Sequence, residues 1–361
     1  MKVLILHPDF SDPGGVSSYY RKLKGNYAFP VEHYITGRRP GENGRLAQAV
    51  RLIQDYAKFL VKVGSGNHDI VHVNPSLDPR SFLRDGVFVI LARLFNKKTV
   101  AFFHGWDDTF AKKITDNGAR RFKYLYGNAD AIVVLAEKFK KKLESWGCTQ
   151  PIYREVIVMD DDVFNGFDIE QGIEDRLKSE KWRILFLSRV VREKGIYETI
   201  EAVSMLAGKY PQVELIIAGD GKELDNVKSY VKEKSVPNII FAGYVVGEEK
   251  YRLLKSSNVF FFPTYYGEGF PNTIVEAMTF GLPVVTRPVG GIADFFRNGE
   301  HGFATESKDP AVFADILSNL LKDRQLYRRI SLFNRQYAKE NLLASQAALR
   351  LEKVYETVLA S

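Results

Sequence analysis

Cysteine and long apolar runs are what this sequence has least of. Among its 361 residues Cys148 is the only cysteine, so no disulfide can form within the chain, and a reducing compartment such as the cytoplasm is expected. No run approaches the roughly 18 apolar residues that span a bilayer. The opening "MKVLILHP" turns polar too early for a signal peptide and instead predicts a first strand.

Several catalytic signatures are also missing. The sequence contains neither the G-x-G-x-x-G of a dinucleotide site nor the G-K-S/T of a P-loop, and it has no serine nucleophile elbow and no H-E-x-x-H. The partial pattern "AGDGKE" (218–223) indicates only a turn. The acidic run "DDD" (160–162) resembles paired metal-binding carboxylates, but its place in a presumed linker favours a solvated loop. No metal site is therefore predicted.

What the sequence does contain is the alternation of a βαβ protein. With 45% hydrophobic and 26% charged residues it has the composition of a soluble globular protein, and its length favours two domains. Apolar runs alternate with helical patterns, which predicts parallel sheets covered by helices on both faces. The runs that predict strands lie at 3–6, 69–73, 98–103, 131–135, 183–187, 213–218, 238–241, 259–262 and 283–285.

The expected fold class is α/β, with two doubly wound (Rossmann-like) domains facing across a cleft. The stretch "MDDDVFNGFD" (159–168) is expected to be a hinge between a first domain at 1–165 and a second at 166–337. The helical segment from about 338 to 361 is expected to pack back on the first domain. Doubly wound domains bind ligands at the carboxyl ends of their strands, so residues that follow strands are the functional candidates.

Positive charge is concentrated in the first half. Residues 1–158 carry 25 Lys and Arg against 15 Asp and Glu, whereas residues 159–361 carry 26 against 29. The densest clusters, 111–124 and 137–143, are interleaved with aromatic residues, which suits nucleic acid or an anionic membrane. A solvated helix face explains the same pattern. Five aromatic residues of these clusters could insert shallowly into a membrane, although some of them belong to the core. They are Phe110, Phe122, Tyr124, Tyr126 and Phe139.

The most informative stretch is "YGEGFPNTIVEAM" (266–278), which joins a predicted buried strand to a predicted short helix. Pro271 and Asn272 suit a helix opening, where the missing N–H of proline is harmless and a side-chain cap is favoured. The free N–H groups of a helix start suit a phosphate. Glu268 and Glu276 would place two hydrogen-bond acceptors around it. The alternative is that these acids merely favour the helix dipole.

Cationic side chains follow the predicted strand at 183–187. In "LSRVVREKG" (187–195), Arg189 and Lys194 are expected at the carboxyl end of that strand. A guanidinium with an ammonium suits a diphosphate and neutralises it as a leaving group. Arg192, between them, is a rival for either role.

Two further candidates follow strands of the first half. Gly14 and Gly15 come soon after the first strand, and paired glycines let backbone amides approach a phosphate closely. His72 and His104 stand at strand ends. Each of these histidines is either a structural residue or a polar group of the site, with His104 the stronger candidate.

Together these motifs resemble those of the family 4 glycosyltransferases. The residues that carry the resemblance are "EGFPNTIVE" (268–276), Arg189 followed five residues on by Lys194-Gly195, the Gly14-Gly15 loop and His104. Members of that family are retaining enzymes of the GT-B fold that use nucleotide sugars without a metal. The likeness spans residues 1 to about 340 and is closer in the second half.

The resemblance implies a role for each position. Arg189 and Lys194 would hold the donor diphosphate, and the amides of 270–272 would cap it. Glu276 would hold the ribose hydroxyls, and Val245 would flank the base. Glu268 would bind the donor sugar, His104 would lie beside the anomeric centre, and Gly15 would complete the phosphate site. The implied catalytic residues are His104, Arg189, Lys194 and Glu268. The implied donor-binding residues are Gly14, Gly15, Arg189, Lys194, Val245, Glu268, Gly269, Phe270, Pro271, Asn272 and Glu276.

The predicted function is retaining hexosyl transfer from a UDP- or GDP-linked donor to an acceptor hydroxyl, in glycan, lipopolysaccharide or glycolipid assembly. No cofactor is expected. A front-face reaction, in which the leaving phosphate deprotonates the acceptor, is the preferred hypothesis, because the family has no agreed carboxylate nucleophile. The expected partners are a glycan or lipid-linked acceptor and an anionic membrane surface. The expected location is the cytoplasm, with peripheral attachment to the cytoplasmic membrane face.

Two other classes stay open. A nucleotide-sugar epimerase or hydrolase of the same fold would convert or split the donor with no acceptor present. A non-enzymatic nucleic-acid binder would use the basic first half and would show salt-dependent binding to DNA or RNA. The cluster of Arg189, Lys194, Glu268 and Glu276 has no purpose in that last interpretation, so nucleic acid is not an expected partner.

Overall fold

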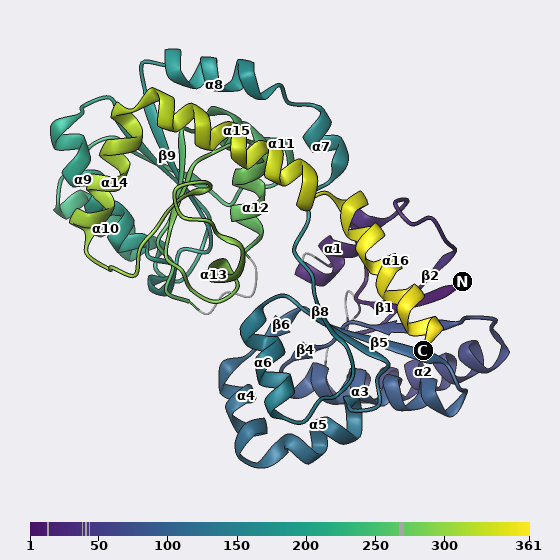
Figure 1. The fold of residues 1–361 in the computed structure, drawn as a ribbon. Helices are drawn as coiled ribbons and strands as arrows, with labels where there is room; N and C mark the ends of the chain where they lie inside the picture. Colours follow the sequence, from purple (N-terminus) through teal and green to yellow (C-terminus); the bar gives the residue numbers. More distant parts are fainter. Residues whose placement is uncertain (13, 38, 40–41, 43, 267–270) are drawn as a thin grey trace. The chain divides into compact units, whose positions relative to one another are not determined.

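The computed structural model divides the chain into two compact units, each built on a parallel sheet (Figure 1). It describes residues 1–12, 14–37, 39, 42, 44–266 and 271–361. The first unit consists of Met1–Val158 together with Ala344–Ser361, and the second consists of Met159–Leu343. In the described part of the chain, no helix is both long and apolar enough to span a membrane.

The first unit has a six-stranded sheet in the order β2-β1-β3-β5-β7-β8. These strands are β1 (Val3–His7), β2 (Val31–Ile35), β3 (Ile70–Val73), β5 (Lys98–Phe103), β7 (Ala131–Val134) and β8 (Ile152–Arg154), with a separate parallel pair of β4 (Ser76–Leu77) and β6 (Gly105–Trp106). Its helices are α1 (Gly15–Leu23), α2 (Arg45–Ser65), α3 (Pro79–Leu94), α4 (Asp108–Lys113), the π-helix η1 (Ile114–Gly118), α5 (Ala119–Tyr126), α6 (Glu137–Ser145) and α16 (Ala344–Ala360).

The second unit has a six-stranded sheet in the order β11-β10-β9-β12-β13-β14. These strands are β9 (Trp182–Leu187), β10 (Val213–Ala218), β11 (Ile239–Gly243), β12 (Val259–Phe262), β13 (Val284–Thr286) and β14 (Gly302–Ala304). The helices, which cover both faces (Figure 1), are α7 (Asp161–Asn165), α8 (Ile169–Lys178), the 3₁₀ helix η2 (Arg192–Lys194), α9 (Ile196–Lys209), α10 (Leu224–Glu233), α11 (Gly247–Ser256), α12 (Asn272–Thr279), α13 (Ile292–Phe295), α14 (Pro310–Lys322) and α15 (Arg324–Asn341).

Both sheets reverse their strand order beside the first strand of the unit. In the first unit the reversal falls between β1 and β3, and in the second it falls between β9 and β12. At such a reversal, the loops that leave the carboxyl ends of the two adjacent strands run to opposite faces of the sheet. Ligands of doubly wound folds bind in the crevice between these loops. The described candidate residues after β1, β9 and β12 therefore stand at these two switch points.

The predicted strands are confirmed, and the strands that the sequence analysis missed are mostly edge strands. The central strands β1, β3, β7, β9 and β12 are buried almost throughout, which accounts for their unbroken apolar runs. The missed strands β2 and β8 are partly exposed edges of the first sheet, and β14 is an edge of the second. An edge strand has one neighbour and need not be apolar.

The predicted docking of the C-terminal helix on the first domain is confirmed. Helix α16 belongs to the first unit and packs against α1 (Figure 1). Its Arg350 donates through Nε to both carboxylate oxygens of the buried Glu155, at 3.0 and 3.1 Å. Its Tyr355 hydroxyl lies 2.5 Å from His72 Nδ1.

The domain boundaries differ from the predicted 165 and 338. The chain divides after Val158 and again after Leu343. The stretch expected to be a hinge is structured within the second unit, because the Met159 amide donates to the Leu342 carbonyl at 2.7 Å and Asp160 caps α7. Helix α15 also continues unbroken past residue 338 to Asn341.

Candidate active site

The loop after β9 carries two of the predicted cationic residues. Gly195 ends η2 in the left-handed conformation, with φ of 79°, and a Cβ there would lie 2.5 Å from the Pro263 carbonyl oxygen. Only glycine permits so close an approach to the loop after β12. The glycine of the Lys194-Gly195 motif is thus required by the backbone.

The loops after β9 and β12 are joined directly. The Glu193 carbonyl accepts from the Tyr265 amide at 3.0 Å, from the Tyr266 amide at 3.1 Å and from the Thr264 hydroxyl at 3.3 Å. These bonds bring the arginine–lysine motif and the entry to the glutamate motif together, although about 70 residues separate them in sequence.

The three cations of the β9 loop have different surroundings. Lys194 is 6% exposed, and its ammonium lies 4.6 Å from the Tyr266 ring centroid and 5.5 Å from that of Phe262. Arg189 is exposed, whereas the guanidinium of Arg192 stacks over Tyr197 at 4.6 Å. Aromatic faces attract a cation, so these two rings help to fix the position of the Lys194 ammonium.

Two glycines that the sequence analysis interpreted as a turn support this loop. A Cβ at Gly219 would lie 1.9 Å from the Ser188 carbonyl oxygen, and one at Gly221 would lie 2.4 Å from that of Val190. The Val190 amide donates to the Asp220 carbonyl at 2.9 Å. The "AGDGKE" segment thus packs against the backbone on both sides of Arg189, and the G-x-G pattern was its sequence signal.

Glu276 has a partner that the sequence did not reveal. It is 6% exposed on α12, and Lys250 of α11 donates to its Oε1 at 2.6 Å. Val245 is also buried, in the loop between β11 and α11. The ion pair therefore joins the helix that carries Glu276 to the segment that carries Val245.

The start of α12 differs in one respect from the expectation. Pro271 is the N-cap residue and makes no side-chain cap hydrogen bond, and Asn272 is the first helical residue. Asn272 is exposed and lies one position too late to act as the cap. The predicted site residues Glu268, Gly269 and Phe270 lie outside the described residues.

In the first unit, the glycine loop leads directly into α1. Gly14 precedes the helix and Gly15 is its first residue. The Gly14 amide donates to Asp12 Oδ1 at 2.6 Å, and a Cβ at Gly14 would lie 2.7 Å from that oxygen. The side chain of Asp12 thus already binds one of the two amides predicted for a phosphate.

His104 belongs to a buried hydrogen-bonded chain that reaches the C-terminal helix. Its Nε2 lies 3.0 Å from Asn74 Oδ1, which also accepts from the Tyr20 hydroxyl at 2.6 Å. The Tyr20 oxygen lies 3.0 Å from His72 Nε2, and His72 Nδ1 lies 2.5 Å from the Tyr355 hydroxyl.

The donors in this chain can be assigned in order. The Asn74 amide donates to the Leu6 carbonyl at 2.8 Å, so Oδ1 is the atom that faces Tyr20 and His104. His104 must then donate through Nε2–H. Because the Tyr20 proton points to Asn74, His72 donates through Nε2–H and accepts from Tyr355 at Nδ1.

The assignment leaves His104 neutral with a bare Nδ1. Burial, reinforced by the nearby His72, holds the pKa of His104 well below its usual range. Burial likewise lowers the pKa of His72 to about 3. Within the described residues, His104 Nδ1 is buried without a hydrogen-bond partner. An unpaired buried acceptor of this kind suits a ligand hydroxyl.

The acidic run at 160–162 and Cys148 were the other candidates in the sequence, and both have structural roles. Asp160 caps α7 by accepting from the Asp162 amide. The described residues contain no group of three His, Cys, Asp or Glu side chains placed to hold a metal ion. Cys148 is buried, and burial raises the pKa of its thiol to about 11. A neutral buried thiol is a poor nucleophile.

Residues 168–337 match the model of a known family, glycosyl transferases group 1. The matched range lies within the second unit and includes Arg189, Lys194 and Glu276. The chain is 28% identical over 243 residues to the capsular polysaccharide biosynthesis glycosyltransferase CapM of Staphylococcus aureus, covering 64% of this chain and 62% of that protein. It is 25% identical over 252 residues to the uncharacterized glycosyltransferase MJ1059 of Methanocaldococcus jannaschii, covering 58% and 60%. The matches span less than two thirds of these relatives.

Solved structures show the fold of the whole chain. HepE of Anabaena, in complex with UDP and glucose, has a TM-score of 0.70 at 18% identity, and the match covers 99% of this chain and 100% of that one. Sucrose-phosphate synthase of Thermosynechococcus elongatus has a TM-score of 0.74 at 18% identity, with 99% of each chain covered. The protein has the GT-B fold, and the predicted fold class of two doubly wound units is confirmed.

Proposed function

We propose that this protein is a retaining glycosyltransferase that moves a sugar from a nucleotide diphosphate donor to an acceptor hydroxyl, without a metal. The observation that carries the proposal is the junction of the β9 and β12 loops through the Glu193 carbonyl, with Arg189 and Lys194 beside it. The group 1 family match over the same unit supports it. HepE of Anabaena, which has a similar fold, was solved in complex with UDP, so UDP is the first donor nucleotide to test.

The proposed chemistry follows from charge. Departure of the sugar leaves negative charge on the diphosphate, and preorganised cations stabilise that charge more than they stabilise the ground state. Lys194 is buried against aromatic rings, so its charge acts where water screens it little. We propose a front-face reaction, in which the leaving phosphate oxygen takes the proton of the acceptor hydroxyl. In this proposal, Nδ1 of His104 accepts a hydrogen bond from a hydroxyl group of the sugar.

The test of donor binding uses a matched cation. Thermal stabilisation by UDP, GDP and their sugar derivatives is measured for the wild type and for Arg189→Ala, Lys194→Ala and Arg192→Ala. We expect one nucleotide series to stabilise the wild type. Loss of Arg189 or Lys194 should weaken this and lower turnover by roughly 10²–10³. Arg192→Ala should change little, because its guanidinium stacks on Tyr197. Equal behaviour of the three variants would contradict the proposal.

The reaction class is tested through its products. The preferred donor is incubated with and without candidate glycan or lipid-linked acceptors, and proton NMR follows the anomeric configuration of the first product. A transferase with retention gives product of the donor's configuration, and the acceptor accelerates donor consumption. Full-rate conversion without an acceptor would identify an epimerase or a hydrolase. Inverted product would overturn retention.

For the acceptor side, the proposal is cytoplasmic peripheral attachment through the basic helices α5 and α6, in glycan or glycolipid assembly. Of the five aromatic residues named for insertion, Phe122, Tyr126 and Phe139 are core residues, and Tyr124 is the most exposed at 72%. Attachment would therefore be mainly electrostatic and sensitive to salt. Co-sedimentation with neutral and anionic vesicles, at low and high salt, tests it. Equal binding to both vesicle types would contradict it.

A further inference from the structure

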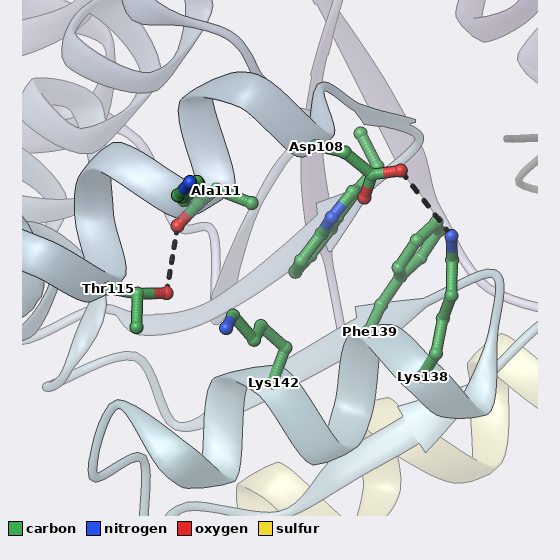
Figure 2. Close-up of a pocket in the computed structure, with 8 residues that line it drawn as sticks. Asp108, Ala111, Thr115, Lys138, Phe139 and Lys142 are labelled. Atoms are coloured by element: carbon green, nitrogen blue, oxygen red, sulfur yellow. Dashed lines mark hydrogen bonds and ion pairs between the residues drawn. The ribbon is translucent and has the colours of Figure 1, made fainter.

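A basic pocket in the first unit lies beside β6, the short strand that directly follows His104. The pocket has a volume of about 330 Å³ and is framed by α4, η1 and α6 (Figure 2). Its lining includes two aromatic rings, one carboxylate and three ammonium groups, from Trp106, Phe139, Asp108, Lys112, Lys138 and Lys142. The predicted site residues do not include any of these side chains.

Aromatic packing makes the walls of the pocket firm. The Trp106 ring is nearly parallel to Phe139, with centroids 4.2 Å apart, and to Trp146 at 5.9 Å. Trp146 Nε1 donates to the Thr115 hydroxyl at 3.0 Å, and that hydroxyl donates to the Ala111 carbonyl at 3.0 Å. These bonds tie the end of α6 to the π-helix, an irregularity frequent at functional sites. The pocket is preorganised.

The charges around the pocket do not balance. Lys138 lies 3.7 Å from the Asp108 carboxylate and 5.1 Å above the Phe139 ring. In the described part of the chain, neither Lys112 nor Lys142 has an ion-pair partner. Figure 2 shows Lys142 extending from α6 toward α4 and η1. Lys138 and Lys142 are one helical turn apart, where like charges repel. Three ammonium groups against one carboxylate leave an excess positive charge of two.

We propose that this pocket binds the phosphate or diphosphate group of the acceptor. The inference rests on the proposed function and specifies its acceptor as a phosphorylated molecule. A phosphate monoester carries a charge of about −1.5 to −2 at neutral pH, which matches the excess better than a single carboxylate does. Flexible ammonium groups bind phosphate as point charges. The aromatic wall suits the ring or hydrocarbon that carries the phosphate.

The position of the pocket along the chain fits an acceptor site. The Asp107 amide donates to the Leu77 carbonyl at 3.1 Å, and the His104 amide donates to the Pro75 carbonyl at 3.1 Å. The segment between His104 and the pocket is thereby held against β4 and against Pro75, the residue before β4. A phosphate bound near Trp106 would anchor the acceptor a short distance from His104.

The first experiment uses glucose 1-phosphate as the probe. Calorimetric titration is performed on the full chain saturated with UDP, so that the donor site is filled. The test variant is Lys112→Gln with Lys142→Gln. The matched control is Lys113→Gln with Lys141→Gln, which removes the same charge from exposed neighbours outside the pocket lining on the same helices. We expect the test variant to weaken binding at least about tenfold and the control to bind like the wild type.

The second experiment distinguishes a soluble phosphate from a lipid one. Phosphatidylcholine vesicles that contain phosphatidic acid, a phosphate monoester, are compared with vesicles that contain phosphatidylglycerol at equal total charge. Preference for phosphatidic acid that is lost in the test variant and kept in the control identifies a lipid source. Binding of glucose 1-phosphate without such preference identifies a soluble source. Either result supports the pocket as a phosphate site.

The proposal is overturned if the test and control variants behave alike in both experiments, or if the wild type binds neither probe. Binding of UDP to the wild type is measured first and independently. If the wild type does not bind UDP, the proposed function is contradicted. If it binds UDP but the test variant binds the phosphate probes as well as the control does, only the phosphate pocket is contradicted.

Discussion

The ion pair between Arg350 and Glu155 holds the C-terminal helix on the first unit, and its removal has a calculable effect. Glu155 is 3% exposed, and it accepts from Arg350 Nε and Nη2 and from the Val156 amide. Changing Arg350 to methionine keeps most of the apolar stem and leaves this carboxylate buried without its cation. Removing one partner of a buried pair costs about 3–5 kcal/mol.

The low end of that range applies here. The Arg350 side chain is 34% exposed, so water can partly replace the guanidinium. We therefore expect Arg350→Met to lower the free energy of unfolding by about 3 kcal/mol. For a unit of this size that loss lowers Tm by roughly 6–12 °C. Lys353→Met, at an exposed site on the same helix, should change stability by less than about 0.5 kcal/mol.

The effect should depend on pH in a defined direction. Burial raises the pKa of Glu155 above its usual value, although Arg350 opposes the shift. A carboxyl group with a raised pKa binds its proton more tightly in the folded state, so its contribution to stability falls as pH rises between the unfolded and folded pKa values. Without Arg350 the pKa of folded Glu155 rises further, so the pH range over which stability falls extends to higher pH. Arg350→Met should be closest to wild type at acidic pH and furthest from it at neutral pH.

Calorimetry from pH 5 to 8, with hydrogen exchange of residues 344–360 as the local measurement, tests this reasoning. The double variant Glu155→Gln with Arg350→Met removes the buried charge, so it should be more stable than Arg350→Met and lose the pH dependence. Two outcomes would refute the argument: an Arg350→Met curve parallel to wild type at all pH values, or a double variant less stable than the single one.

Three further predictions concern the candidate site. Nitrogen NMR of protein with labelled histidine should find His104 neutral from pH 5 to 8, with its proton on Nε2. Protonation of His104 near the ordinary pKa of histidine would contradict the assigned hydrogen-bond donors. Lys250→Met should lower the free energy of unfolding by about 3 kcal/mol and weaken UDP binding, because Glu276 loses its cation. Arg252→Met on the same helix should do neither. Gly219→Ala should abolish UDP binding, because its Cβ would displace the loop that carries Arg189. Gly208→Ala, which meets no atom within 4 Å, serves as its control in thermal titrations, and equal effects would refute the steric argument.

The central strands could be predicted from the sequence because both faces of a parallel sheet are buried. Such strands must be apolar along their whole length, as β1 and β12 are. The edge strands β2 and β8 were not predictable in this way, since partial exposure allows residues such as Glu32 and Arg154 within them. The domain boundary was misplaced because local polarity resembles a linker even where Asp160 caps a helix.

By itself the sequence determined the central strands, the class of two doubly wound α/β domains and the positions where cations, glycines and acids follow strands, because these features depend on local periodicity and on spacing along the chain. The expectation of the GT-B fold came from the resemblance of the motifs to a known family. Only the tertiary structure decided which of these groups meet. Lys250 pairs with Glu276, the Glu193 carbonyl joins two distant loops, and Tyr355 completes a chain that begins at His104. Such pairings join residues that are far apart in sequence, and burial then sets the protonation of His104 through neighbours that no local pattern contains.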